Sequence, residues 1–513
     1  KDAGEGYRTY TSNEPRTYAE KLISWLVESK MMLRIPHADR QRHERDIDQE
    51  KERFVLGALR SADERLLNIL QPTIRDQVAW HICVRGWSAG RALLVKRGDR
   101  TYVDVAPFDV RNLTWGMGPD GLEWACYKTR KTREEIEAAY DVEIPSGRPV
   151  GEDDTIDVYD FYDKTDNAVV MQDQELKAST PHGSDRVPIW LRMVGTQPMI
   201  QTESIDDAIA DFGESVFSND RDVYDKHNFA MSVLLELSAR ARKQVVAITS
   251  RDGTKTLAED PFKEGAEISL SEGERLDVIP MMETAKEMGA YMGLISGDLQ
   301  RGSLPHSVYG DIQFQLSGFA ITTLRQGIES ILVPRIDAMT QVYTQIVNLL
   351  IDQYSSGSYE AMELSGNDMN RDYFSHEISP EFVRAGCDPE IHFVAQLPED
   401  DMLKFQMAQI GRDGPTPLLS DKYIRDKTLG LQDAEGEEDT IKEQLAEHTL
   451  PEAMLYTLMT AAENRGRSDL AQFYFKQLMM LVMQQQGGMM PPGQDGQPAQ
   501  PMNGGGAPNG ANP

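Results

Sequence analysis

The stretch from Met281 to Tyr354 constrains this chain most, because it predicts two helices joined by a short loop. The second helix opens at Ser317 and repeats apolar residues every three or four positions, the period of one helical face. A helix of this length spans roughly 50 Å at about 1.5 Å per residue, more than one domain core requires. We expect it to cross between domains or to span an assembly. A long core helix of a helical domain is the alternative.

Pro334 lies inside this apolar pattern. Proline removes one backbone donor and clashes with the preceding turn, so we expect a kink there. The whole stretch contains no metal-ligand set and no nucleophile, which favours a mechanical role.

The N-terminal 202 residues mix helical and strand patterns. Apolar spacing predicts a helix over 17–35, ended by Pro36, and a second over 52–82. The charged run 37–53 between them is expected to be a solvated loop or an exposed helical face. Alternation with turn signals predicts antiparallel hairpins over 91–129, and further strands lie in 153–171 and 187–195. Thr132 and Glu135 predict a capping box that opens a helix.

A small β insert is predicted between two helices in the middle of the chain. Residues 203–246 are expected to be helical, with Arg240, Arg242 and Lys243 near the end, where the helix dipole favours cations. Three short strand-like runs follow over 246–280. An insert carried on two helices resembles an arm with a docking tip.

The C-terminal part begins with strand character around Ile391, Phe393 and Ala395, and helices are predicted over 396–483. Methionines at its end favour soft packing between subunits, because methionine adapts to irregular interfaces. The tail 484–513 is rich in Gly, Pro, Gln and Asn, a composition that cannot bury enough apolar surface to fold.

The net charge of −30, from 83 acidic and 53 basic residues, excludes a free-standing module that grips DNA. An acidic protein can instead let DNA slide, because like charges suppress tight phosphate binding. Three cysteines without a CxxC pair favour a reducing compartment over disulfides or a zinc site. No apolar run approaches the ~18 residues that span a bilayer, so no membrane partner is expected. The sequence starts at Lys1 and not at Met, so we expect residues to precede it.

The sequence presents no convincing catalytic site. It lacks a GxxxxGK[ST] phosphate loop, an HExxH pair and a GxSxG elbow, so neither an enzyme nor a cofactor or metal is expected. Two alternatives stay open. One is a metal-dependent DNA-processing enzyme that uses the acidic region from Glu152 to Asp163. The other is a helical scaffold that does not contact DNA.

The order of these elements resembles the portal proteins of tailed double-stranded DNA bacteriophages, over roughly residues 15–480. Trp87, Arg91, the hairpins through Val103-Asp104-Val105 and the GPDGLEW turn are similar to the portal wing. The resemblance divides the chain into a wing (1–202), a first stem helix (203–246), a clip (247–280), a second stem helix (281–301), a tunnel loop (302–316), a long kinked helix with the rest of the wing (317–395), a helical crown (396–483) and a disordered tail (484–513).

The resemblance implies an α+β, mainly helical subunit of a ring, usually a dodecamer, at one capsid vertex of the virion, assembled in the host cytoplasm. It implies double-stranded DNA, the terminase large subunit, a head-tail adaptor, and the major capsid and scaffold proteins as partners. Residues expected at the DNA channel are Arg301, Ser303, Leu304, His306, Val308 and Tyr309 in the tunnel loop and Arg240, Arg242 and Lys243 at the stem end. Residues expected at the clip, where terminase and adaptor dock, are Lys255, Phe262, Ile268 and Leu270.

Overall fold

The computed structural model contains both helices and antiparallel sheets, as the predicted α+β class requires. It divides into two units, residues 1–399 and 400–513. The described residues are 8–35, 42–98, 100–144, 155–171, 174–195, 213–241, 245–253, 256–257, 261, 267–279, 286–304, 318–356, 358–367, 373–384, 388–395, 401–412, 418–429, 437–438, 441–442, 444–445, 449–464 and 467–486.

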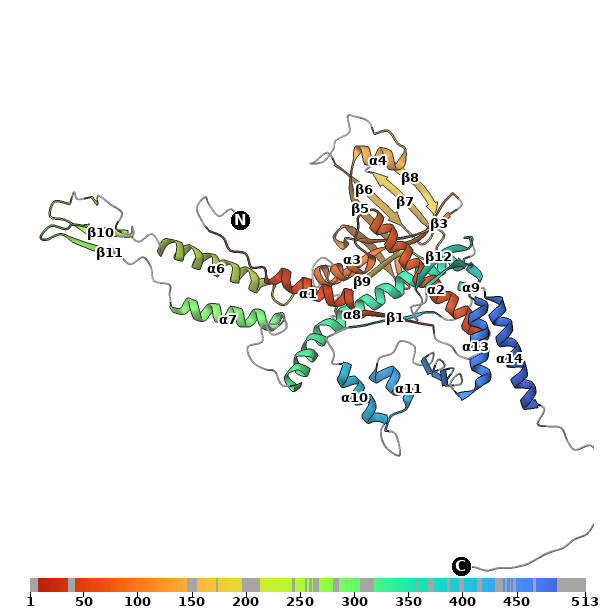
Figure 1. Ribbon diagram of the computed structural model, residues 1–513. Helices are drawn as coiled ribbons and strands as arrows, with labels where there is room; N and C mark the ends of the chain where they lie inside the picture. The colour runs from red at the N-terminus through yellow and green to blue at the C-terminus, as the bar shows by residue number, and fades with distance from the viewer. Residues whose placement is uncertain are drawn as a thin grey trace, which may run out of the picture. The chain divides into compact units, whose positions relative to one another are not determined.

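The long predicted helix is α8 (Gly318–Ser355), which continues through Pro334. From Leu332 to Tyr354 its apolar face is buried in the main core of the first unit. It packs there against helix α1 (Glu14–Glu28) and strands β2 (Trp87–Arg97), β9 (Ile189–Met193) and β14 (Glu390–Val394) (Figure 1). The C-terminal part of α8 is therefore a core helix, the alternative left open by its spacing. The expected kink stays a prediction.

The side-chain amide of Gln353 joins α8 by hydrogen bonds to the sheet β3-β2-β9. Strand β3 is Arg100–Phe108. Strand β9 pairs with β2 only as far as Arg91. Beyond that point the fully buried Gln353 accepts a hydrogen bond from the Leu94 backbone N–H and donates one to the Ala92 carbonyl, both at 2.9 Å. The helix thus supplies the hydrogen bonds that a longer β9 would otherwise make.

We expect Gln353→Ala to lower the free energy of unfolding by about 2–4 kcal/mol, because it leaves buried backbone groups unpaired and opens a cavity. The change should be measured by denaturant unfolding against Gln341→Ala, an exposed position on the same helix. Equal effects at the two positions would contradict this role for the Gln353 amide.

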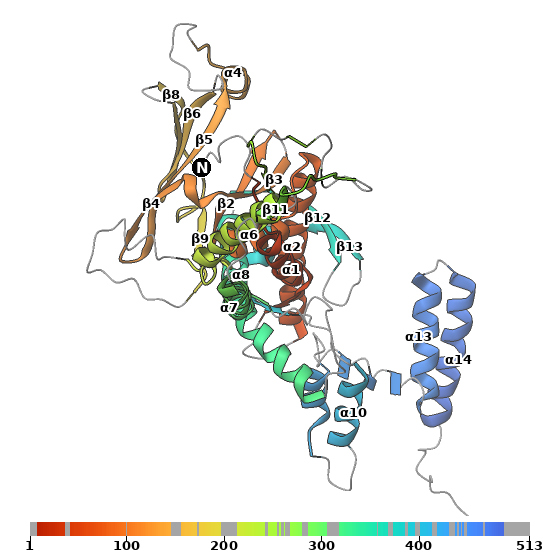
Figure 2. The same ribbon diagram turned by 90° about the vertical axis from the view of Figure 1, so that its left-hand side faces the viewer.

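Of the hairpins predicted over 91–129, β2-β3 belongs to the first sheet, and the other begins a second sheet with the order β4-β5-β6-β7-β8. Its strands are β4 (Leu113–Gly118), β5 (Gly121–Thr132), β6 (Thr155–Tyr162), β7 (Asp166–Met171) and β8 (Gln174–Pro181). Alternate residues of β6 and β7 are buried, as the period of a strand with one covered face requires. The capping box of Thr132 and Glu135 opens α4 (Arg133–Tyr140), which lies against this sheet (Figure 2).

The first predicted helix is too long. Helix α1 ends at Glu28, and residues Lys30–Arg34 form strand β1, which pairs antiparallel with β14. The Ser29 hydroxyl donates to the Leu26 carbonyl and helps end the helix. Met31 and Leu33 fit a helical face equally well, and the partner strand that decides their structure lies more than 350 residues away.

The second predicted helix is divided in two. Helix α2 (Arg42–Asn68) takes up much of the charged run, and α3 (Ile74–Trp80) starts at Thr73, whose hydroxyl accepts from the Asp76 N–H. A π-helical turn, His81–Arg85, follows. The first unit is completed by the sheet β12 (Met362–Asn367) and β13 (Tyr373–Ile378) and by the short α9 (Pro380–Arg384).

The second unit is helical, as predicted. It contains α10 (Asp401–Arg412), α11 (Asp421–Tyr423), a π-helical turn at Ile424–Thr428, α13 (Pro451–Asn464) and α14 (Ser468–Gln486). Helices α13 and α14 pack on each other as a hairpin (Figure 2). Helix α14 extends past the predicted end of the crown at residue 483, and the rest of the predicted disordered tail lies outside the described residues. None of the helices described in this structure combines the length and the apolar content that crossing a membrane requires.

Candidate functional site

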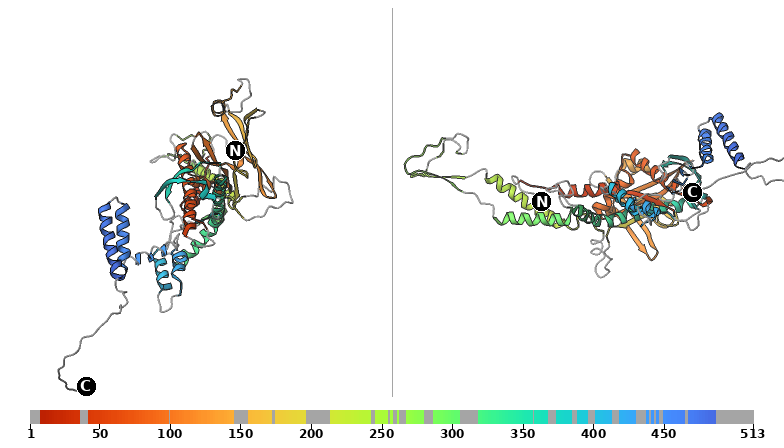
Figure 3. Two further views of the ribbon diagram at one scale, coloured as in Figure 1. Left: turned by 90° about the vertical axis from the view of Figure 1, so that its right-hand side faces the viewer. Right: turned by 60° about the horizontal axis from the view of Figure 1, so that its bottom comes forward.

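The candidate site is a two-helix arm with a β hairpin at its tip. It consists of α6 (Arg221–Ala241), β10 (Val245–Thr249), β11 (Arg275–Ile279) and α7 (Lys286–Gly302). The two helices lie side by side, and the strands pair antiparallel beyond their ends (Figures 1 and 3). The tip has two strands in its described part and not the expected three, because 267–270 form no strand. The alternation of Ile268 and Leu270 is too short to distinguish strand from coil.

A small apolar cluster holds the two helices together at the base of the arm. Tyr224 of α6 packs with Ile295 and Leu299 of α7, with Phe217 and Val223 beside them. Asp220 directly precedes α6 and is only 3% exposed, and its Oδ2 has no hydrogen-bond partner among the described residues. A Cβ on Gly302 would lie 1.8 Å from the Asp220 Oδ1. The Asp220 carboxylate therefore fills the space that a side chain at position 302 would need.

We expect Gly302→Ala to destabilise the arm base by about 1–3 kcal/mol, because the new methyl group overlaps a buried carboxylate. Gly297→Ala on the same helix is the control, since its Cβ would meet nothing within 4 Å and alanine favours the helix. Hydrogen exchange of α6 and α7 is the readout. The double variant Gly302→Ala/Asp220→Gly should regain most of the loss, and a lack of rescue would contradict the contact.

The burial of the Asp220 carboxyl also leads us to expect that the stability of the protein depends on pH. Burial, and then the nearby Asp298, raise the pKa of the Asp220 carboxyl above its ordinary value. The folded protein therefore carries a disfavoured charge at neutral pH, a cost that disappears as the pH falls to the ordinary aspartate pKa. We expect Asp220→Asn to raise the melting temperature at pH 7 and to have no effect near pH 4. A shift that is independent of pH would exclude this explanation.

The outer half of the arm has apolar side chains that stay at least partly exposed wherever they are described. No described side chain of α6 after Ala230, or of α7 before Ile295, is buried. Leu235 of α6 and Leu294 of α7 are 38% and 69% exposed. Glycines 289, 293 and 297 repeat every four residues along one face of α7, and a Cβ at each would meet nothing within 4 Å. This repeat is visible in the sequence, although our sequence analysis did not identify it.

The structure changes the assignment of three residues expected in the tunnel loop. Arg301 lies in the last turn of α7, exposed and 3.5 Å from Asp298. The Ser303 N–H and hydroxyl both donate to the Leu299 carbonyl, at 3.0 and 2.5 Å, so this residue closes the helix. Leu304 is 2% exposed within the main core, so the expectation that it projects into a channel is wrong. Its apolar side chain instead packs in the main core of the first unit, directly after α7.

The remaining site residues are only partly described. Arg240 lies in α6 next to its last residue, Ile268 is half-buried, and Leu270 is 42% exposed. The others lie outside the described residues: Arg242, Lys243, Lys255, Phe262, His306, Val308 and Tyr309.

Two carboxylates of the acidic region make local contacts. Asp157 lies 2.6 Å from Lys128 and 3.3 Å from Arg130, and the hydrogen bond from Lys128 is the main cause of its lowered pKa. Asp163 accepts from the backbone N–H groups of Thr165 and Asp166 in a turn, which lowers its pKa. Glu152, Asp153 and Asp154 lie outside the described residues. Within the part of the chain that is described, no group of three acidic, His or Cys side chains could hold a metal ion.

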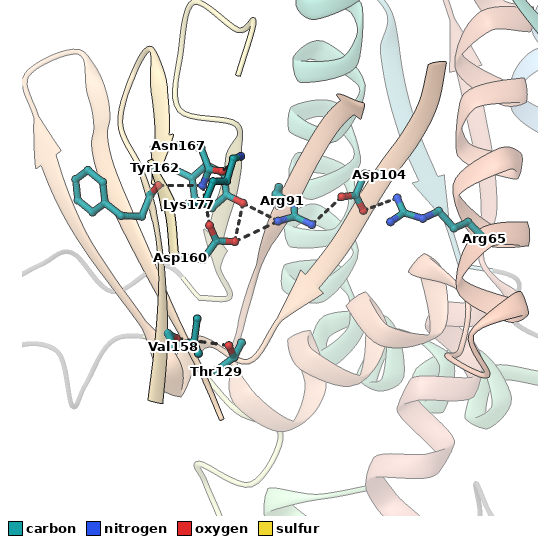
Figure 4. A network of polar contacts seen from close by, with 10 residues as sticks. Arg65, Arg91, Asp104, Thr129, Val158, Asp160, Tyr162, Asn167 and Lys177 are labelled. Atoms are coloured by element: carbon teal, nitrogen blue, oxygen red, sulfur yellow. Dashed lines mark hydrogen bonds and ion pairs between the residues drawn. The ribbon is translucent and has the colours of Figure 1, made fainter. Parts of the chain in front are cut away.

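Asp160 belongs to a polar network that joins the two sheets (Figure 4). Arg91 of β2 lies 3.2 Å from Asp160 of β6 and 2.7 Å from Asp104 of β3, and it donates to the Tyr162 hydroxyl at 2.6 Å. Burial would lower the pKa of Arg91, but Tyr162 and the two carboxylates raise it. Arg65 of α2 extends the network through Asp104. These contacts give the buried acidic groups a structural role.

No family model matches this chain. No curated protein matches it either. Among solved structures, it is similar to a chain from the neck of an empty GTA particle computed with C6 symmetry, at 14% identity and a TM-score of 0.46, covering 82% of this chain and 90% of that chain. It is also similar to a chain from the neck of a native GTA particle computed with C12 symmetry, at 13% identity and a TM-score of 0.39, covering 74% of this chain and 89% of that chain. At these TM-scores the likeness is partial, and no residue role is transferred from either structure.

Proposed function

We propose that copies of this chain assemble into a closed ring, a portal at one vertex of a viral capsid, through which double-stranded DNA enters and leaves. The observation that carries the proposal is the outer half of the arm, where no described apolar side chain of either helix is buried within one chain. Exposed apolar surface of this kind is typical of a protein–protein interface. Neighbouring arms in a ring would cover it.

The remaining features suit a conduit better than an enzyme. The net charge of −30 lets DNA pass without tight phosphate contacts. The resemblance in element order supports a dodecameric ring, with the arm tip as the docking surface for the terminase large subunit and then for a head-tail adaptor. The capsid and scaffold proteins are the partners of the part of the first unit outside the arm. In this proposal the chain catalyses no reaction.

The nuclease alternative receives less support. Asp157, Asp160 and Asp163 bind three separate sets of protein donors, and Asp160 is held within the network around Arg91. A metal site would have to break these contacts. Mg²⁺-dependent DNA cleavage that is lost in Asp154→Ala would restore this alternative.

Two experiments test the proposal. Negative-stain images of the purified chain should show rings with a central hole, and monomers at every concentration would overturn the proposal. In a packaging system, deletion of residues 306–310 should leave rings intact but reduce DNA-filled heads. Ser303 and Leu304 are kept in this deletion because Ser303 bonds to the last turn of α7 and Leu304 belongs to the main core. Normal DNA content in the heads would exclude the loop from the channel.

A further inference from the structure

The turn between α2 and α3 exposes three large apolar side chains. Leu67, Ile69 and Leu70 are 54%, 61% and 93% exposed. The stretch from Leu67 to Pro72 contains no charged residue. We call these three side chains the knob. Single exposed apolar residues are ordinary, but three within four positions mark an interaction site.

The backbone holds the knob in an unusual conformation. The Leu70 N–H donates to the Leu67 carbonyl and the Gln71 N–H to the Leu66 carbonyl, the two bonds of a Schellman motif that ends a helix. Leu70 occupies the left-handed position of this motif, with a φ of 58°, where glycine is the common residue. A leucine here strains the backbone and buries nothing in its own chain. Strain of this kind points to a function outside the single chain.

An apolar groove lies between α1 and the end of α3. Its volume is about 630 Å³, and its lining includes Ala19, Ile23, Val27, Trp80, Val84 and Phe217. Trp80 is 40% exposed, although it is the largest side chain in the groove. The rim is charged: the Arg16 Nε lies 2.7 Å from the Glu20 carboxylate, and the Asp76 carboxylate accepts a hydrogen bond from the Thr73 hydroxyl. An apolar centre within a polar rim is the usual anatomy of a protein interface.

We propose that the knob of one copy seats in the α1–α3 groove of the next copy around the ring. The knob lies just before the first residue of α3, and Trp80 of the groove is the last residue of α3. Each copy therefore carries both a knob and a groove, the two surfaces that a head-to-tail contact requires. Contacts of this type repeat around a closed ring. The uncharged knob matches the uncharged centre of the groove.

The size of the knob favours a second copy over a foreign protein. A stable independent complex buries roughly 800 Å² on each partner, and three side chains supply only part of that area. A neighbouring copy that the arms already hold in place needs no larger contact area at this position. The inference therefore rests on the proposed ring and assigns one of its contacts.

Cross-linking tests the pairing in the full chain. Ser24 lies in the groove and Asn68 in the turn of the knob, and both are exposed. Oxidation of the double variant Ser24→Cys/Asn68→Cys should give a ladder of disulfide-linked multimers. A mixture of the two single variants should stop at dimers, and each single variant alone should resemble the unsubstituted chain. Rings that give no ladder would overturn the inference while leaving the ring proposal standing.

A second variant separates association from folding. Leu70→Gly should raise the melting temperature of the dissociated chain, because it relieves the strained φ, yet weaken ring assembly at least tenfold in the midpoint concentration. Asp141→Gly is the control, since Asp141 also has a positive φ of 53° and lies at the end of α4. It should not alter assembly. Unchanged assembly of Leu70→Gly would overturn the inference, whereas a complete absence of rings from the unsubstituted chain would instead overturn the proposed function.

Discussion

Arg91→Ala is expected to lower the free energy of unfolding by about 3–5 kcal/mol, because it removes hydrogen bonds to Asp104, Asp160 and Tyr162 at once. Asp104 keeps its ion pair with Arg65, whereas Asp160 loses its arginine. The Arg91 side chain is 22% exposed, and those of Asp104 and Asp160 are 12% and 19% exposed. Water therefore screens these charges only weakly. Denaturant unfolding, followed by tryptophan fluorescence, gives the comparison with the unsubstituted chain.

Arg111→Ala is the matched control. Arg111 also bonds to a carboxylate, Asp109, at 2.6 Å, but its side chain is 65% exposed. An exposed pair of this kind contributes about 0–1 kcal/mol. If the two variants lost the same stability, the network in Figure 4 would be a surface feature and not a joint between the sheets.

Arg91 illustrates what the sequence could predict and what it could not. The hairpins around it were predicted correctly, because turn residues and alternation are local signals. The network was not predicted, because Arg91, Asp104 and Asp160 come from three strands whose neighbours are decided by the tertiary fold. Asp160 was therefore considered with the other acidic residues of its segment and not with the arginine that it binds.

Errors at element ends have the same origin. Residues 30–34 fit a helical face, and only pairing with β14 makes them a strand. Leu304 follows a predicted stem helix and was placed in a channel, yet it contributes to the core. In contrast, α6, α7 and α8 were predicted in the right order, because their apolar periodicity extends over many turns. Long periodic elements are thus predictable, and the contacts of single residues between them are not.

The glycine row of α7 gives the last prediction, which concerns the ring itself. A glycine inside a helix costs roughly 0.5–1 kcal/mol relative to alanine, so three at four-residue spacing weaken a helix that has little core to support it. Such a row is favourable where a second helix approaches closely. We therefore expect Gly293→Phe to abolish rings in mass photometry and negative stain. The helical circular dichroism of the dissociated chain should not fall, because a Cβ at this position meets nothing within 4 Å and phenylalanine favours a helix more than glycine does.

Gly293→Ala is the control at the same position. It adds one methyl group, so rings should still form, and α7 should exchange its amide hydrogens more slowly because alanine stabilises the helix. Normal rings from Gly293→Phe would show that this face of α7 is not an interface, and the apolar outer half of the arm would then have to be covered by another partner. Loss of helix in the dissociated Gly293→Phe chain would contradict the open space seen around that residue. Loss of rings without loss of helix is the result that the exposed, coreless half of the arm predicts.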